Sequence, residues 1–176
     1  MKQNKTPTVR SEATDLLTRV DGQGGYSHLL VDQVIKKKEF SSKDARLFTE
    51  IVYGTLQRKL TLEYYLSAFV PKKRKIDAWV KWLLLLSIYQ LHYLTKVPDH
   101  AVIHEAVEIG KRKGHAGIAK FVNGVLRNIQ RKGLPSTASI KDPLEKLSIE
   151  TSHPLWLVKR WTEMYGLERT SKMCEE

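Results

Sequence analysis

The densest set of chemically capable side chains in the sequence is cationic and lies between residues 111 and 132. This stretch contains seven Lys and Arg residues and no Asp or Glu. Ammonium and guanidinium groups without acidic neighbours bind phosphate oxygens through charge-assisted hydrogen bonds. The stretch therefore predicts a polyanion site, with nucleic acid as the first choice and an anionic membrane as the second. We expect phosphate contacts from Lys111, Arg112, Lys113, Lys120, Arg127 and Arg131, joined by Arg10 near the start of the chain.

The segment IAKFVNGVLRNIQRKG (118–133) indicates how part of this set is positioned. On a helix its apolar residues fall in one narrow arc, and Lys120, Arg127 and Arg131 lie almost opposite. Gly124 lies beside these cations and costs about 1 kcal/mol relative to Ala in a helix interior, which predicts a close backbone neighbour, either another helix or a ligand. A solvated surface is the alternative for any single basic helix face. No aromatic residue is evident on the cationic face, so we expect phosphate contacts without base reading.

Other candidate sites are weaker. His100 and His104 are one helical turn apart, but the HExxH pattern is absent, so we expect no metal site. The single cysteine, Cys174, has no neighbouring His and is not expected to be a nucleophile. The glycine-rich GQGGYS (22–27) lacks the GxGxxG and P-loop patterns and is expected to connect two helices. The KKRK cluster (72–75) is expected to be an exposed loop and no targeting signal.

The elements that must hold these residues are all predicted to be helices. Apolar residues recur at helical spacing over most of the chain, and no segment alternates for long at the strand period. The most apolar run, WLLLLSIYQLHYL (82–94), is interrupted by Ser87, Gln90 and His92 and has the length of a buried core helix, too short to span a bilayer. The predicted fold class is all-α, with helices expected over 9–20, from 27, 41–59, 62–69, 76–94, 98–114, 118–133, near 144–147 and over 152–166.

Charge divides the chain into two predicted domains. Residues 1–135 contain 24 basic and 12 acidic residues, whereas residues 136–176 contain 6 and 7. The change falls at the turn-rich GLPSTAS (133–139), so we expect a basic domain over 1–135 and a helical appendage over 136–176. The first residues have no apolar core after their basic start, so no signal peptide is expected and the predicted location is the cytoplasm.

Four stretches of the sequence carry a family resemblance. LFTEIVYGTLQRKLTLEYYL (47–66), LLLLSIYQLHYLTKVPDHAVIHEAVEIGKR (83–112) and FVNGVLRNIQR (121–131) resemble the NusB-type helical RNA-binding domain. SHPLWLVKRWTEMYG (152–166) is similar to the segment that joins such a domain to the catalytic part in the RsmB (Sun/Fmu) family of ribosomal RNA small-subunit cytosine-5 methyltransferases. The resemblance covers nearly the whole chain and implies a NusB-like bundle followed by a short helical linker.

The resemblance also implies what this chain does not contain. Family enzymes continue into an S-adenosylmethionine-binding domain with two catalytic cysteines, and Cys174 matches neither cysteine motif. The expectation is therefore a domain that binds ribosomal RNA and positions the substrate, inactive alone, with no cofactor of its own. The expected partners are ribosomal RNA and the missing catalytic domain, with no metal or membrane, and the expected state is monomeric.

Two alternatives stay open at this point. One is a stand-alone antitermination factor of the NusB type, which binds RNA and a partner protein without catalysis. The segment 152–166 argues against it, because such a factor is expected to end near the seventh helix. The other alternative makes the basic helices a docking surface for protein.

Overall fold

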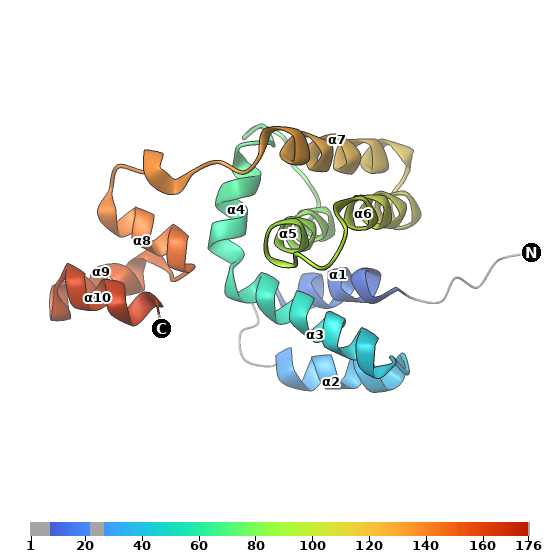
Figure 1. Cartoon of the computed structure of the whole chain (residues 1–176), viewed down its shortest axis with the longest axis horizontal. Helices are drawn as coiled ribbons and strands as arrows, with labels where there is room; N and C mark the ends of the chain where they lie inside the picture. The colour runs from blue at the N-terminus through green and yellow to red at the C-terminus, as the bar shows by residue number, and fades with distance from the viewer. Residues whose placement is uncertain (1–7, 22–26, 176) are drawn as a thin grey trace, which may run out of the picture.

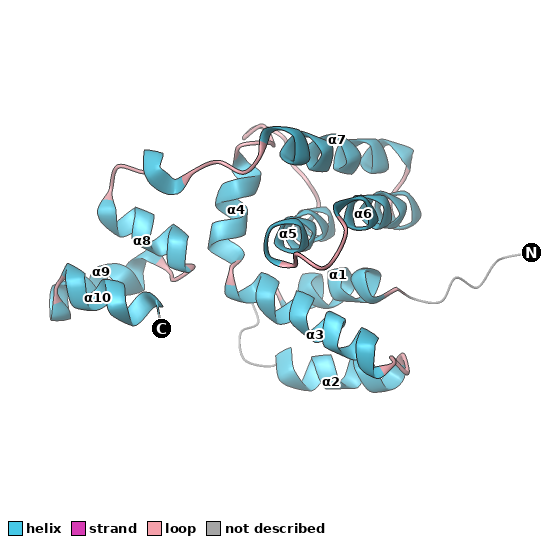
Figure 2. Cartoon of the chain, viewed as in Figure 1, coloured by secondary structure: helices cyan, strands magenta, loops and turns pink. Residues whose placement is uncertain are grey.

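A computed structural model of the chain describes residues 8–21 and 27–175. Within these ranges the regular structure is entirely helical, which confirms the all-α prediction (Figures 1 and 2). Most of the glycine-rich segment 22–27 lies outside the described residues. The elements are α1 (Val9–Val20), α2 (Ser27–Lys37), α3 (Ser42–Gln57), α4 (Lys59–Ser67), α5 (Ala78–Tyr93), α6 (Asp99–Lys113), α7 (Ala116–Lys132), the 3-10 turn η1 (Thr137–Ser139), α8 (Pro143–Thr151), α9 (Leu155–Tyr165) and α10 (Leu167–Glu175).

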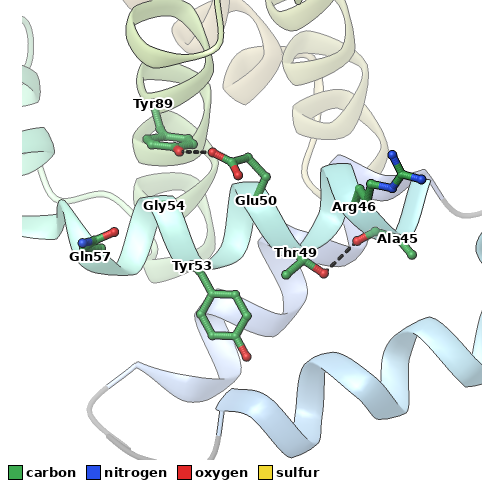
Figure 3. A pocket seen from close by; sticks show the side chains of 8 residues that line it. All are labelled: Ala45, Arg46, Thr49, Glu50, Tyr53, Gly54, Gln57 and Tyr89. Atoms are coloured by element: carbon green, nitrogen blue, oxygen red, sulfur yellow. Dashed lines mark hydrogen bonds between the residues drawn. The ribbon is translucent and has the colours of Figure 1, made fainter. Parts of the chain in front are cut away.

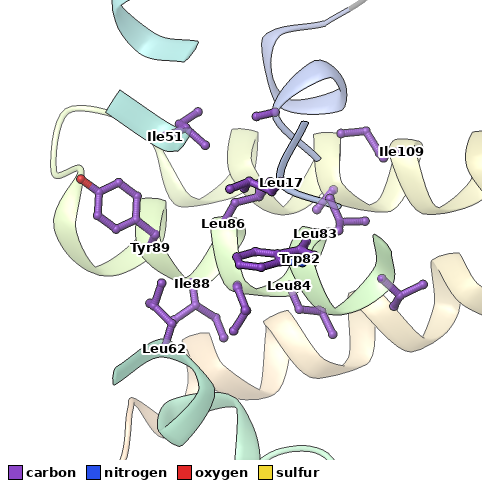
Figure 4. Packing of buried hydrophobic residues seen from close by; sticks show 14 of the residues in the cluster. Leu17, Ile51, Leu62, Trp82, Leu83, Leu84, Leu86, Ile88, Tyr89 and Ile109 are labelled. Atoms are coloured by element: carbon purple, nitrogen blue, oxygen red, sulfur yellow. The ribbon is translucent and has the colours of Figure 1, made fainter. Parts of the chain in front are cut away.

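The core is built around the middle of α5, which is buried around its whole circumference. Every residue of α5 from Trp82 to Gln90 is buried, and α1, α3, α4, α6 and α7 all pack against this helix (Figure 4). A helix that is apolar around its whole circumference is stable only when other helices surround it. Each fully buried leucine contributes about 1.5–3 kcal/mol relative to an exposed one. The predicted core helix is therefore confirmed.

One leucine of α2 lies on the outer side of the helix. In α2 the buried residue is Val31, at 2% exposure, whereas Leu29 is 65% exposed. Leu29 does not belong to the inner face with Leu30, Val34 and Ile35. At about 100° per residue, Leu30, Val31, Val34 and Ile35 fall within one arc of about 140°, and Leu29 lies about 100° outside this arc. The buried face of α2 therefore follows the helical spacing of its own residues.

Helices α3 and α5 approach closely at Gly54. A Cβ atom at this glycine would lie 2.0 Å from Tyr89 Cζ, so only a hydrogen fits between the two helices. The Tyr89 hydroxyl donates a hydrogen bond of 2.7 Å to the Glu50 carboxylate, one turn earlier on α3 (Figure 3). Burial of the ring, and then this hydrogen bond to a negatively charged acceptor, raise the pKa of Tyr89 to about 12 from its ordinary value of 10.0.

This raised pKa predicts a loss of stability in alkali. The folded state holds the Tyr89 proton more tightly than the unfolded state, so the stabilisation is complete below about pH 10 and is lost as the pH rises towards 12. We expect the free energy of unfolding to fall over this range, and to fall less in the Tyr89→Phe variant. Urea denaturation at several pH values, with the phenolate absorbance followed in parallel, measures both. If the free energy of unfolding fell equally in both proteins between pH 10 and 12, the raised pKa could not be assigned to Tyr89.

The last three helices form a small cluster against α4. Leu147, Val158 and Cys174 are buried together, with Leu144 and Trp161 packed beside them. Ser152 follows α8 in the left-handed conformation, with φ 58°, and its hydroxyl accepts a hydrogen bond of 2.9 Å from the Leu60 N–H near the start of α4. The hydroxyl thus satisfies one of the free N–H groups of that helix terminus from outside the helix. The division into two domains at residue 135 stays a prediction.

Candidate nucleic-acid interface

The outer face of α7 carries the cations that the sequence analysis selected on this helix. Lys120, Arg127 and Arg131 are all exposed, while the opposite face buries Val122, Val125, Leu126 and Ile129. We call these three residues the α7 ridge. Its first and last members are separated by about 16 Å along the helix axis, given a rise of about 1.5 Å per residue. Arg127 donates to the Gln130 amide oxygen at 3.2 Å and Arg131 to that of Asn128 at 3.0 Å, and these neutral acceptors leave both charges unbalanced.

Gly124 lies on this exposed face, and its surroundings differ from one of the two predictions made for it. A Cβ atom built on Gly124 would meet no atom within 4 Å. The idea that another helix approaches here is therefore wrong for the described part of the chain. The physical reason is that Gly124 falls on the outer side of α7, whereas the close contact with α6 is made on the inner side, where Gly110 faces Ala119. The other prediction, a ligand close to the backbone, stays a prediction.

The three cations at the end of α6 do not share one environment. Lys111 and Arg112 are exposed, and neither has a carboxylate within 4.0 Å among the described residues. Lys113 instead forms an ion pair with Asp15 of α1 and lies 5.9 Å from the centre of the Trp79 ring. Its charge is balanced within the fold, so we leave Lys113 out of the proposed interface.

Arg10 also has internal partners. Its guanidinium donates one hydrogen bond of 2.5 Å to the Gln90 amide oxygen and another of 2.5 Å to the Glu105 carboxylate, and its side chain is only 13% exposed. These contacts join α1 to α5 and α6. Arg10 therefore supplies a link between core helices, and we leave it out of the proposed interface as well.

The structure adds a group of cations that the sequence analysis set aside. The loop from α4 to α5 carries Lys72, Lys73, Arg74 and Lys75, all exposed, and it passes against α7. The contact is specific: the Arg74 guanidinium carbon lies 4.0 Å from the centre of the Phe121 ring. Four consecutive cations were visible in the sequence, but their position beside α7 was not, because the contact spans almost fifty residues of chain.

These segments together form what we call the basic face. None of its members has a carboxylate within 4.0 Å in the part of the chain that the structure describes. Cations with no acidic partner keep their full attraction for an external anion. The basic face consists of Lys72, Lys73, Arg74, Lys75, Lys111, Arg112, Lys120, Arg127, Arg131 and Lys132.

Candidate catalytic and metal groups do not converge with the basic face. His100 and His104 are exposed on α6, and the described residues contain no group of three potential metal ligands. Cys174 is a free, buried thiol, and burial raises its pKa, which disfavours the reactive thiolate. Within the described ranges, no helix combines the length and apolar character needed to cross a membrane.

An open groove of about 530 Å³ along α3 is a second candidate site (Figure 3). It is lined on the α3 side by Arg46, Thr49, Glu50 and Tyr53, and on the α5 side by Tyr89. Glu50 accepts the Tyr89 hydrogen bond, and the Thr49 hydroxyl donates to the Ala45 carbonyl at 2.7 Å. Glu50 thus serves the contact between α3 and α5, and Thr49 is bonded within α3, so the basic face is the stronger candidate.

An all-helical domain with a group of exposed cations that have no acidic partners is typical of nucleic-acid-binding modules. Residues 7–131 match the NusB family, and the chain belongs to that family. The match includes the whole α7 ridge and the 72–75 loop. The family assignment predicted from the sequence is confirmed.

Comparisons with curated proteins give longer and shorter relatives. The chain is 52% identical over 170 residues to the probable ribosomal RNA small subunit methyltransferase B of Bacillus subtilis (strain 168), covering 97% of this chain and 38% of that protein. It is 30% identical over 128 residues to the transcription antitermination protein NusB of Bacillus velezensis, covering 72% of this chain and 95% of that one. The chain thus spans little more than a third of its methyltransferase relative.

A solved structure supports the fold. A crystal structure of the antitermination factors NusB and NusE in complex with dsRNA matches 70% of this chain and 94% of its own chain, with a TM-score of 0.63 and 21% identity. At this identity the likeness concerns the helical fold alone.

Proposed function

We propose that this chain binds small-subunit ribosomal RNA and positions it for an RNA cytosine-5 methyltransferase, whose catalytic part lies outside this sequence. The observation that carries the proposal is the basic face, ten cations from three segments without acidic partners. Contacts of this kind fix the position of an RNA backbone and supply affinity without base specificity. The chain then acts as a docking module in the cytoplasm, monomeric, and performs no chemistry by itself.

The comparisons support the methyltransferase setting over the antitermination alternative. The methyltransferase relative aligns with 97% of the chain, whereas the antitermination relative aligns with 72%. The alignments cover 170 and 128 residues, and the difference corresponds to the part of the chain after residue 131, which includes the last three helices. A stand-alone factor that binds RNA and a partner protein is the second candidate function, favoured by the 95% coverage of the shorter relative.

The methyl donor expected for such an enzyme is S-adenosylmethionine, and the described residues do not fit it. The family resemblance implies that a separate Rossmann-like domain, built of strands and helices with a glycine-rich loop, holds this cofactor. The described part of this chain contains helices only. None of its residues is therefore assigned to the cofactor, and we derive no step that involves it.

The salt dependence of RNA binding tests the proposal. Each phosphate contact lowers log K by about 0.7–0.9 per tenfold increase in salt, so five or more contacts predict a slope of about −4. We expect the dissociation constant for a small-subunit ribosomal RNA fragment to rise roughly 100-fold between about 0.1 and 0.3 M salt. Fluorescence anisotropy at several salt concentrations measures the slope. A slope near zero, or no binding at low salt, would contradict the proposal.

We also propose a protein partner for the last helices. Trp156, Met164 and Leu167 of α9 and α10 are 66%, 59% and 46% exposed, an unusual number of large apolar side chains on so small a unit. The occupant that we favour is the catalytic part of the longer protein, because this unit is nearest to it in sequence. The test compares the chain alone with a chimera in which the chain replaces the aligned segment of the Bacillus subtilis relative. Amide hydrogen exchange in α9 and α10 is expected to be slower in the chimera. Equal exchange rates would contradict the contact.

A further inference from the structure

The stacked pair of Arg74 and Phe121 is a feature that phosphate binding alone does not use. The guanidinium carbon lies over the Phe121 ring, 4.0 Å from the ring centre, and Arg74 as a whole is exposed. No hydrogen bond or ion pair joins this side chain to another described residue. We propose that the outer side of the Arg74 guanidinium is a stacking platform for one unpaired RNA base. This inference rests on the proposed RNA-binding function and adds the kind of RNA that is bound.

The platform is held in place from both sides. Phe121 is half-buried and packs against the main core from α7. Arg74 lies in a turn closed by a hydrogen bond of 3.0 Å from its own N–H to the Pro71 carbonyl. A flexible arginine loses side-chain entropy when it orders on a ligand, whereas one already stacked on an aromatic ring loses less. The pair is therefore organised before RNA arrives.

The surroundings of the platform suit a nucleotide whose base stacks there. Lys72, Lys73 and Lys75 flank Arg74 along the loop, and Lys120 precedes Phe121 on α7, so phosphates on either side of the stacked base meet cations. One helical turn after Lys120, Gly124 offers open space where any other residue would place a side chain. Positions three and four apart are neighbours on a helix surface, so this space adjoins both Lys120 and Phe121.

The geometry selects unpaired over paired RNA. A base inside a duplex already stacks on its neighbours, and its face is not available to a protein side chain. Unpaired bases in loops and single strands stack on aromatic rings and on guanidinium planes, and this stacking tolerates any base. From the sequence alone no stacking group was expected on this face, because Arg74 and Phe121 meet only in the folded chain.

The experiment compares two RNAs and two variants. One RNA is a hairpin with an unpaired loop that contains 2-aminopurine, and the other is a blunt duplex of the same length. Arg74→Lys keeps the charge and removes the planar group, and Lys73→Gln is the matched control that removes one charge and keeps the platform. We expect Arg74→Lys to weaken hairpin binding on the order of 10-fold, to leave duplex binding unchanged and to abolish the 2-aminopurine fluorescence change.

The outcomes separate this inference from the function on which it rests. Lys73→Gln is expected to weaken both RNAs by a similar factor. Phe121→Leu, a change that keeps an apolar side chain against the core, is expected to reproduce the Arg74→Lys result. If the wild-type chain binds both RNAs and Arg74→Lys binds the hairpin as tightly as wild type, the platform is overturned and the proposed function stands. If the wild-type chain binds neither RNA, both are overturned, as they would be if it bound only an acidic peptide.

Discussion

Reversing the charges of Arg127 and Arg131 together is expected to weaken binding of a small-subunit ribosomal RNA fragment by at least about 30-fold at 0.1 M salt. Both side chains are exposed, and both donate only to neutral amide groups one turn away on α7. Replacing them with glutamate removes two phosphate contacts and adds two repulsive charges. The slope of log K against log salt is expected to become shallower by about 1.5, because each lost contact removes about 0.7–0.9.

Two control variants separate the ridge from net charge and from fold. Lys159→Glu combined with Arg160→Glu changes the net charge by the same amount on two exposed positions of α9. That pair is expected to change affinity by less than about threefold at the same salt, since only long-range, screened repulsion remains. Arg10→Met removes a cation that links core helices and is expected to lower the free energy of unfolding by about 1–2 kcal/mol without weakening RNA binding. If the α7 ridge variant and the α9 variant lost the same amount of RNA affinity, the assignment of the ridge as an RNA contact would be wrong.

Gly54→Ala is expected to lower the free energy of unfolding by about 2 kcal/mol, because the space beside Gly54 is already filled. The new methyl group would lie 2.0 Å from Tyr89 Cζ and 2.1 Å from its hydroxyl oxygen. The ring cannot move away easily, since it is 5% exposed and stacks on Tyr93 with ring centres 5.2 Å apart. Overpacking of this kind costs about 3 kcal/mol, and the better helix propensity of alanine returns about 1 kcal/mol.

The same substitution at Gly124 is the matched control, and its effect has the opposite sign. No atom lies within 4 Å of a Cβ at Gly124, so Gly124→Ala is expected to stabilise the chain by up to about 1 kcal/mol. Chemical denaturation of both variants measures the contrast. In a Tyr89→Leu background, Gly54→Ala is expected to cost much less, because the ring that it meets is gone. A full cost in that background would contradict the steric explanation.

Much of the fold was predictable because the apolar spacing is regular. The mostly apolar segment from Trp82 to Gln90, which is buried throughout, identifies the central helix. Thr8 and Ser41 mark the starts of two helices, because their hydroxyls accept hydrogen bonds from Ser11 N–H and Asp44 N–H. The buried face of α2 follows the same rule, with Val31 inward and Leu29 outward. Leu30, Val31, Val34 and Ile35 fall within one arc of about 140° on the helix, and this arc excludes Leu29.

The candidate site was predictable only in part. Excess positive charge and the missing acids of 111–132 indicated a polyanion surface, and the outer face of α7 agrees with helical geometry. Arg10 and Lys113 were grouped with the ridge from composition alone. The structure gives each an internal carboxylate, Glu105 and Asp15, from a helix far away in sequence.

The sequence by itself determined the helices, the core helix α5, the cationic side of α7 and the family, because these depend on residue types at fixed spacing within single segments. Only the tertiary structure decided which cations stay unpaired and which segments share a surface. An ion pair or a stacked pair depends on distances of a few ångströms between residues such as Arg74 and Phe121, and chain spacing does not fix those distances. The packing of α4, α5 and α7 fixes those distances.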